Sequence, residues 1–253
     1  MRGLSVLIWV VGLAFVSVAV GTAPVQAAAF SIPCTADGCP DLVLATKRHR
    51  AFSIVDRTFL STDCAVQEGM VSPGDRTLIR FAVSAANVGE ADLVMPDPES
   101  RPDLFEWSPC HGHFHFRGFA VYSLWLPEQH EVWQQLRAAN PDVPYDDLLA
   151  NSGLTPPVTA RKLAFCMEDS AKFLHGTKGG PKYTCQSQGI QAGWLDEYKA
   201  KLDGQWLDIT EVPPGHYVLD WELNPDRTIE ESSFGNNAFA FPVKIPNHHG
   251  RGG

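Results

Sequence analysis

The sequence predicts a mainly β fold, an antiparallel β-sandwich with a small helical insertion. Residues 78–84 alternate in the way of a half-buried strand, with Ile79, Phe81 and Val83 on one face. Short apolar stretches of this kind recur through the chain and are separated by Gly, Pro and Asn, which is typical of a sandwich. Residues 127–157 are the exception and read as helical.

The expected elements follow from these patterns. Asn87 to Glu90 supplies the residues of a turn after the first strand. The expected strands cover residues 78–84, 93–95, 115–126, 206–209, 216–223 and 238–245. Within the insertion, residues 128–139 are expected to form a helix, and a second short helix is expected to begin over residues 144–149. We expect this insertion to cover the surface of the sandwich; a lid over the candidate metal site is the alternative.

The N-terminus predicts export. Arg2 is the only charge before an apolar run from Leu4 to Val20, and small residues precede Ala27, so residues 1–27 read as a cleaved secretory signal peptide. The run is short for a spanning helix, and no integral membrane segment is expected after signal cleavage. We therefore expect a secreted, periplasmic or extracellular protein with one catalytic domain over residues 28–246 and a flexible tail over residues 247–253, whose His248 and His249 are not expected to bind metal.

Charge and cysteine content narrow the function further. The formal net charge of −9 is unfavourable for a nucleic-acid-binding protein and favourable for attracting cationic substrates. Six cysteines in an exported chain favour disulfides, but the pairing stays open from the sequence. Cys34 and Cys39 flank a tight, turn-rich segment and are expected to pair with one another. The six are Cys34, Cys39, Cys64, Cys110, Cys166 and Cys185.

Three histidines at alternate positions form the candidate metal site. His111, His113 and His115 share one face if the chain is extended there, while Phe114 and Phe116 face the core. Neutral imidazoles suit Cu(II) or Zn(II), and three of them leave coordination positions open for water or substrate. The alternative is a strand whose histidines only hydrogen-bond one another. Other histidines, such as His130 and His175, are expected to be ordinary.

The amino-acid sequence around these histidines resembles that of a known protein family. Residues 106–115, Glu-Trp-Ser-Pro-Cys-His-Gly-His-Phe-His, resemble the copper-binding segment of the lysyl oxidase family. Residues 161–169 resemble its cofactor-lysine segment, and residues 196–210 resemble its cofactor-tyrosine segment. Residues 224–237 resemble its C-terminal end. The resemblance runs in order from residue 40 to residue 246, which is far more specific than one motif.

This resemblance implies a copper/quinone-dependent amine oxidase that is an oxidoreductase. His111, His113 and His115 match the copper(II) ligands, and Lys162 and Tyr198 match the residues that join to form lysine tyrosylquinone, the self-derived organic cofactor. The implied reaction converts primary amines, with peptidyl lysine among the candidate substrates, to aldehydes; O₂ is consumed and ammonia and H₂O₂ are released. An exported copper-binding protein without the quinone and a β-sandwich binding or adhesion module are the rival functions.

The resemblance also implies a calcium site and a disulfide. A structural calcium is expected between Asp41, the Leu42 carbonyl, Glu231, Asn236 and Asn237, all of which offer oxygen. Ser233 stands where the family has an aspartate, which removes one anionic ligand, and Asn236-Asn237 as an ordinary turn is the alternative. The family pattern pairs Cys110 with Cys185.

The sequence departs from the family at several positions. Val121 aligns with a histidine that animal members carry and that has been put forward as the catalytic base. Lys172 replaces the family partner of Cys166, so Cys64 and Cys166 either pair or stay free. The two cysteines that bracket the tyrosine segment are Trp194 and Gly204 here, which is consistent with a missing bridge. Glu168 and Asp169 either line the site or are solvated charges.

Overall fold

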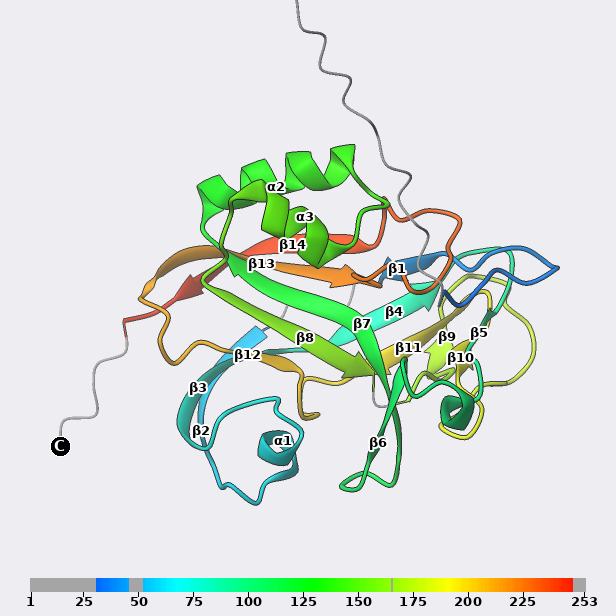
Figure 1. The fold of residues 1–253 in the computed structure, drawn as a ribbon, viewed down its shortest axis with the longest axis horizontal. Coiled ribbons are helices and arrows are strands. Elements are labelled where there is room, and N and C mark those ends of the chain that lie inside the picture. Colours follow the sequence, from blue (N-terminus) through cyan, green and yellow to red (C-terminus); the bar gives the residue numbers. More distant parts are fainter. Residues whose placement is uncertain (1–30, 46–51, 165, 248–253) are drawn as a thin grey trace, which may run out of the picture.

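The computed structural model describes residues 31–45, 52–164 and 166–247 (Figure 1). The expected signal peptide and the tail residues 248–253, with His248 and His249, lie outside the described residues. No helix in the described part of the chain is long and apolar enough to cross a membrane.

Strands dominate the described chain. In order, the elements are β1 (Leu42–Leu44), β2 (Phe52–Phe59), α1 (Cys64–Gln67), β3 (Gly74–Phe81), β4 (Val83–Asn87), β5 (Leu93–Val94), η2 (Pro98–Ser100), β6 (Phe105–Ser108), β7 (His113–Trp125), α2 (Pro127–Ala139), α3 (Tyr145–Ser152), β8 (Val158–Ala164), β9 (Ala171–Lys172), β10 (Gly189–Ile190), β11 (Trp194–Tyr198), β12 (Trp206–Asp208), β13 (Gly215–Leu223) and β14 (Ala238–Ile245).

These strands form four antiparallel sheets, which confirms the mainly β, antiparallel prediction. The largest has the order β14-β13-β7-β6, and β8 also pairs with β7. The others have the orders β1-β4-β11-β9, β12-β3-β2 and β10-β5. β6 uses residues 113–116 of β7 and β13 uses residues 120–125, so β7 joins the histidine segment to the middle of the fold.

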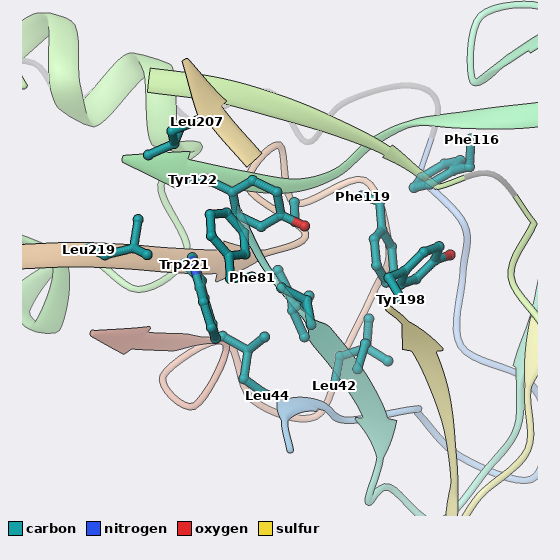
Figure 2. Close-up of a cluster of buried hydrophobic side chains, with 14 of the residues drawn as sticks. Leu42, Leu44, Phe81, Phe116, Phe119, Tyr122, Tyr198, Leu207, Leu219 and Trp221 are labelled. Carbon is teal, nitrogen blue, oxygen red and sulfur yellow. The ribbon is translucent and has the colours of Figure 1, made fainter. Parts of the chain in front are cut away.

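The main core lies where side chains of the three larger sheets meet. Phe81, Tyr122 and Trp221 pack together with ring centroids 4.8–6.5 Å apart. Figure 2 shows Tyr198 side by side with Phe119 in the same cluster, with 5.5 Å between the ring centroids. Burial of these large rings removes apolar surface from water and stabilises the stacked sheets.

All the strands that the sequence predicts occur in the structure, but one of them is divided into two strands. The run at residues 78–84 is split at Ala82, because β3 pairs with β2 and β12 while β4 pairs with β1 and β11. Phe81 and Val83 nevertheless face the same core, so their alternation does not reveal the change of sheet. Strand β11 was not predicted because four of its five residues are buried and its sequence shows no alternation.

Helices α2 and α3 occupy the predicted insertion. They cover Val121 and Trp125 of β7 with Trp133, Tyr145 and Leu148, on the opposite side of the molecule from β6 (Figure 1). His130 is a buried residue of α2, and its Nε2 lies 2.7 Å from Asp220 Oδ2, so it is a core histidine with a polar partner, as expected. None of the residues that line the hollows beside the three histidines comes from 127–157, so the insertion is a cover and not a lid.

Three disulfides join the six cysteines, and one predicted pair is wrong. Cys34–Cys39 forms as predicted. Cys110 pairs with Cys64 instead of Cys185, and Cys185 pairs with Cys166. The physical reason is the position of α1: it lies against the turn between β6 and β7 and brings the Cα atoms of Cys64 and Cys110 to 5.8 Å. Cys64 and Cys166, which the sequence left open, are therefore both bonded.

Candidate metal and cofactor site

The structure gathers the three histidines at the start of β7. Their ring centroids are 5.8 Å (His111 to His113), 5.1 Å (His111 to His115) and 5.1 Å (His113 to His115) apart. The predicted shared strand face is only partly correct, because His111 lies in the turn before β7 and Gly112 has a φ of +69° there. The backbone of the strand therefore positions two rings, and the turn positions the third.

The surroundings of the rings favour neutral imidazoles. His115 is 1% exposed, and burial lowers its pKa to about 3, with further lowering by the cationic forms of His113, His111 and Lys162. Burial, followed by His111, also lowers the pKa of His113. The His113 Nε2 atom is buried and has no hydrogen-bond partner among the described residues. A neutral ring with an unused buried nitrogen fits a transition-metal ligand.

Phe114 and Phe116 anchor the histidine strand as expected. Phe116 is fully buried with its centroid 5.6 Å from Phe105, and the half-buried Phe114 lies 5.1 Å from the ring of Trp107 on β6. In register, Ser108 of β6 stands opposite His113. The hairpin of β6 and β7 is thus held by aromatic pairs across its strands.

Lys162 and Tyr198 meet inside the protein. The Lys162 Nζ atom lies 5.2 Å from the centre of the Tyr198 ring, and the two residues are 1% and 3% exposed. Lys162 is on β8 and stands opposite Ala120 of β7. Burial lowers the pKa of Lys162 to about 7, so a large part of this amine is uncharged near neutral pH.

Tyr198 is fixed at its hydroxyl. The hydroxyl donates to the Cys166 carbonyl at 3.2 Å, and burial together with Asp196 raises the tyrosine pKa. The Cys166 sulfur lies within 4.8 Å of a His113 ring nitrogen, so Cys166 connects the tyrosine to the histidine cluster. Asp196 is itself buried, accepts from Ser170 Oγ at 3.2 Å, and has its pKa raised to about 7 by burial.

A hollow of about 440 Å³ is lined by two of the three histidines and by Tyr198, but not by His115 or Lys162. His111, His113 and Tyr198 line it together with acidic side chains. These acidic residues are Glu168, Asp196, Glu197 and Asp203. Lys162 lines a second hollow, of about 400 Å³, with Glu68 and Gly204.

The sequence left open whether Glu168 and Asp169 line the site or are solvated charges, and the structure gives a different answer for each residue. Glu168 lines the hollow that contains Tyr198. The Asp169 carboxylate instead accepts hydrogen bonds from the backbone N–H groups of Lys182, Tyr183 and Gln191. Asp169 therefore organises a loop and does not face the site.

Two residues near the site escaped the sequence analysis. Glu68 Oε1 lies 3.4 Å from His111 Nδ1, although 43 positions separate the two residues in the chain and no local pattern marks Glu68. Asp196 was noted only as part of a motif. Val121, which aligns with the proposed family base, points into the cluster below α2 and α3 and away from the Lys162 face of β7.

The residues expected to hold calcium also converge. The Leu42 N–H donates to Glu231 Oε2 at 2.6 Å, and Asn237 Nδ2 donates to Glu231 Oε1 at 2.8 Å. Asn236 Nδ2 donates to Asp41 Oδ1 at 2.8 Å. Asn237 Oδ1 is buried without a hydrogen-bond partner among the described residues, and burial raises the pKa of Glu231 to about 7. A half-buried carboxyl beside an unused amide oxygen suits a hard cation.

Comparison with known proteins gives a consistent set of relatives. The family model described as lysyl oxidase matches residues 53–141 and 143–250. Lysyl oxidase homolog 3B of Danio rerio is 31% identical over 221 residues, which are 82% of this chain and 24% of that protein. Protein-lysine 6-oxidase of Gallus gallus is 29% identical over 84% of this chain and 47% of its own length. The chain thus spans between about a quarter and a half of these relatives.

Proposed function

This chain belongs to the lysyl oxidase family, and we propose that it is an exported copper-dependent oxidase of primary amines. The products are an aldehyde, ammonia and H₂O₂, and O₂ is the oxidant. The observation that carries the proposal is the contact between Lys162 and Tyr198, two buried side chains, with His111 and His113 lining the same hollow as Tyr198. Relatives named protein-lysine 6-oxidase make peptidyl lysine a candidate substrate.

His111, His113 and His115 would hold Cu(II). All three can offer a neutral nitrogen, which suits Cu(II) better than Ca²⁺ or Mg²⁺. When bound, copper supplies one-electron exchange with O₂ and lysine tyrosylquinone supplies an electrophilic carbonyl, chemistry that unmodified side chains lack.

Lys162 and Tyr198 are the precursors of the cross-linked cofactor in this proposal. Addition to an oxidised ring needs a neutral amine, and a pKa of about 7 provides one at physiological pH. The Cys166 carbonyl orients the tyrosine through its hydroxyl, and Phe119 packs against the ring. Tyr183 is the competing tyrosine, but its hydroxyl donates to Asp92 at 3.1 Å and it does not line the hollow with the histidines.

Asp196 is the best-placed proton acceptor for the α-proton of the substrate. It is two residues from Tyr198, lines the same hollow, and has a pKa of about 7, which matches a general base near neutral pH. The carboxylates of Glu168 and Glu197 at the same hollow favour a cationic amine over a neutral or anionic substrate.

The calcium site is a separate structural proposal. Asp41, the Leu42 carbonyl, Glu231, Asn236 and Asn237 would tie the entry to β1 to the corner before β14. The hydrogen bonds that Leu42 and Asn237 now make to Glu231 would open to release carboxylate oxygens for the ion.

Copper-loaded protein, stained for quinones by a redox dye and assayed for H₂O₂ release with a panel of primary amines, tests the proposed function. Staining together with amine-dependent H₂O₂ supports it. Copper binding without staining or H₂O₂ would leave the rival function, a copper-binding protein on the same scaffold. Absence of copper binding would refute both, and a binding module with incidental histidines would remain.

A further inference from the structure

His111 needs a separate explanation because β7 does not hold it. His113 and His115 are carried by the strand, whereas His111 lies in the turn at residues 109–112 and its side chain is 28% exposed. A partly exposed ring on a turn has several rotamers, and each proton position leaves a different nitrogen available. For His111 to bind a metal ion together with His113 and His115, neighbouring groups must therefore select one rotamer and one proton position of its ring.

Ser108 and Glu68 contact His111 from one side. The His111 backbone N–H donates to Ser108 Oγ at 3.0 Å, and His111 Nδ1 lies 3.1 Å from the same oxygen. The Ser108 hydroxyl donates to Glu68 Oε1 in a short hydrogen bond. Both partners are shielded from water, since Ser108 is 2% exposed and the Glu68 side chain is 12% exposed.

This arrangement determines the proton position on His111. A serine hydroxyl has one proton, and a carboxylate can only accept. Because the Ser108 proton goes to Glu68, the Ser108 oxygen can only accept from His111 Nδ1. The His111 ring therefore carries its proton on Nδ1 and keeps a lone pair on Nε2. Metal-binding histidines are commonly oriented in this way by a hydrogen-bond acceptor on the second ring nitrogen.

The Cys64–Cys110 disulfide holds Glu68 in place. Glu68 is the residue that caps the C-terminus of α1, and its backbone N–H donates to the Cys64 carbonyl at 2.8 Å. Cys64 is covalently joined to Cys110, the neighbour of His111. The bridge thus ties the short helix that carries Glu68 to the turn that carries His111. The Glu68 Oε2 atom is buried without a hydrogen-bond partner among the described residues.

We propose that Glu68 is a positioning residue that acts through Ser108 to keep the His111 proton on Nδ1 and present Nε2 to a bound copper ion. The part of this inference that concerns copper binding rests on the proposed function. The relay of Glu68, Ser108 and His111 exists without the metal and can be measured in metal-free protein.

The first test is nuclear magnetic resonance of metal-free protein labelled with ¹⁵N-histidine, at a pH where the rings are neutral. Long-range ¹H–¹⁵N correlations report which ring nitrogen carries the proton, and loss of one signal set in His111→Asn assigns His111. We expect wild-type His111 to be protonated on Nδ1. Ser108→Ala should give a mixture of both forms, because it removes the oxygen that accepts from His111 Nδ1. Glu68→Gln should do the same, because a glutamine amide can also donate to the serine oxygen and leave the serine proton for Nδ1. Wild-type His111 protonated on Nε2 would overturn the proposal.

The second test is competition titration with Cu(II) and electron paramagnetic resonance of the copper form. Glu68→Gln and Ser108→Ala should each weaken copper binding by about 10–100-fold and alter the spectrum. Glu128→Gln is the matched control, because it makes the same change of charge in the first turn of α2, on the other side of the molecule from β6 (Figure 1). It should change neither property, and circular dichroism checks that each variant is folded.

The outcomes separate this inference from the proposed function. If the wild-type protein binds no copper, the metal site is refuted, and the magnetic resonance measurement on metal-free protein alone decides whether the proton relay exists. Wild-type protein that binds copper no more tightly than Glu68→Gln would refute the role of Glu68. Unchanged affinity in Ser108→Ala with lost affinity in Glu68→Gln would mean that Glu68 contacts the metal directly, and the relay would be wrong.

Discussion

The Lys162 Nζ atom lies 5.2 Å from the centre of the Tyr198 ring, although the two residues are 36 positions apart and belong to strands of different sheets. Lys162 reaches Tyr198 from β8, which is attached to the largest sheet through β7. Tyr198 ends β11, which pairs with β4 in another sheet. The contact therefore exists only when the two sheets are packed together, and it is the basis of the first prediction.

Lys162 and Tyr198 should be covalently linked in active protein. Mass spectrometry of copper-loaded, active enzyme should find their two tryptic peptides joined. Lys162→Ala and Tyr198→Phe should each retain copper and lose amine oxidation by at least about 100-fold, since neither variant can form the cofactor. Tyr183→Phe is the control and should keep activity. Recovery of both unmodified peptides from active enzyme would refute the cross-link.

His113→Ala should abolish copper binding and activity together. His113 is chosen because its buried Nε2 has no competing partner among the described residues, and its ring lies 5.1 Å from His115 and 5.8 Å from His111. Metal stoichiometry by atomic absorption is the measurement. His175→Ala, an exposed histidine outside the cluster, is the control. Full copper retention in His113→Ala would show that the metal binds elsewhere.

The free energy of unfolding of copper-free protein should depend on pH through Lys162. The pKa of this lysine is about 7 in the folded protein, whereas an ordinary lysine, as in the unfolded chain, has a pKa of 10.5. At a pH between these two values the unfolded chain therefore binds more protons than the folded protein. The Lys162 contribution to stability therefore rises as pH increases from 7 to 10.5, by at most about 1.4 kcal/mol per pH unit. Denaturant titrations of wild type and Lys162→Met should diverge across this range. Parallel pH profiles would contradict a buried, neutral Lys162.

Peptide mapping without reduction should find Cys64 linked to Cys110 and Cys166 linked to Cys185. Cys64→Ser, assayed with Cys110→Ser present to avoid a free thiol, should lower the free energy of unfolding by about 2–4 kcal/mol, because the bridge closes a loop between residues 46 positions apart. A peptide containing Cys110 joined to Cys185 would restore the pairing that the family pattern implied.

Calcium should raise the melting temperature of chelator-treated protein. Binding to the folded state alone stabilises it by mass action, and the buried Asn237 amide oxygen and the half-buried Glu231 carboxyl are the donors. Glu231→Gln should remove the calcium-dependent increase but not the fold. Magnesium serves as the control ion, since it demands a tighter octahedral geometry. An unchanged melting temperature with calcium would mean that Asn236-Asn237 is an ordinary turn.

Local patterns anticipated much of the fold and part of the site. Short apolar stretches separated by Gly, Pro and Asn located β13 and β14 to within one residue. The same reasoning failed for β11, whose buried faces leave no alternation. Histidine spacing correctly brought three rings together, but it placed His111 on the strand, since spacing alone does not distinguish the last residues of a turn from the first of a strand.

The sequence by itself determined the residue types, the insertion between β7 and β8 and the order of the family-like segments, since these depend on neighbours a few positions apart. Only the tertiary structure decided that Glu68 adjoins His111, that Cys64 bonds Cys110, and that burial beside Tyr198 lowers the pKa of Lys162. Each of these depends on which sheet a strand joins and on what is buried beside it. The physical reason is that pairing and desolvation arise between distant segments, and no local window of sequence contains both partners.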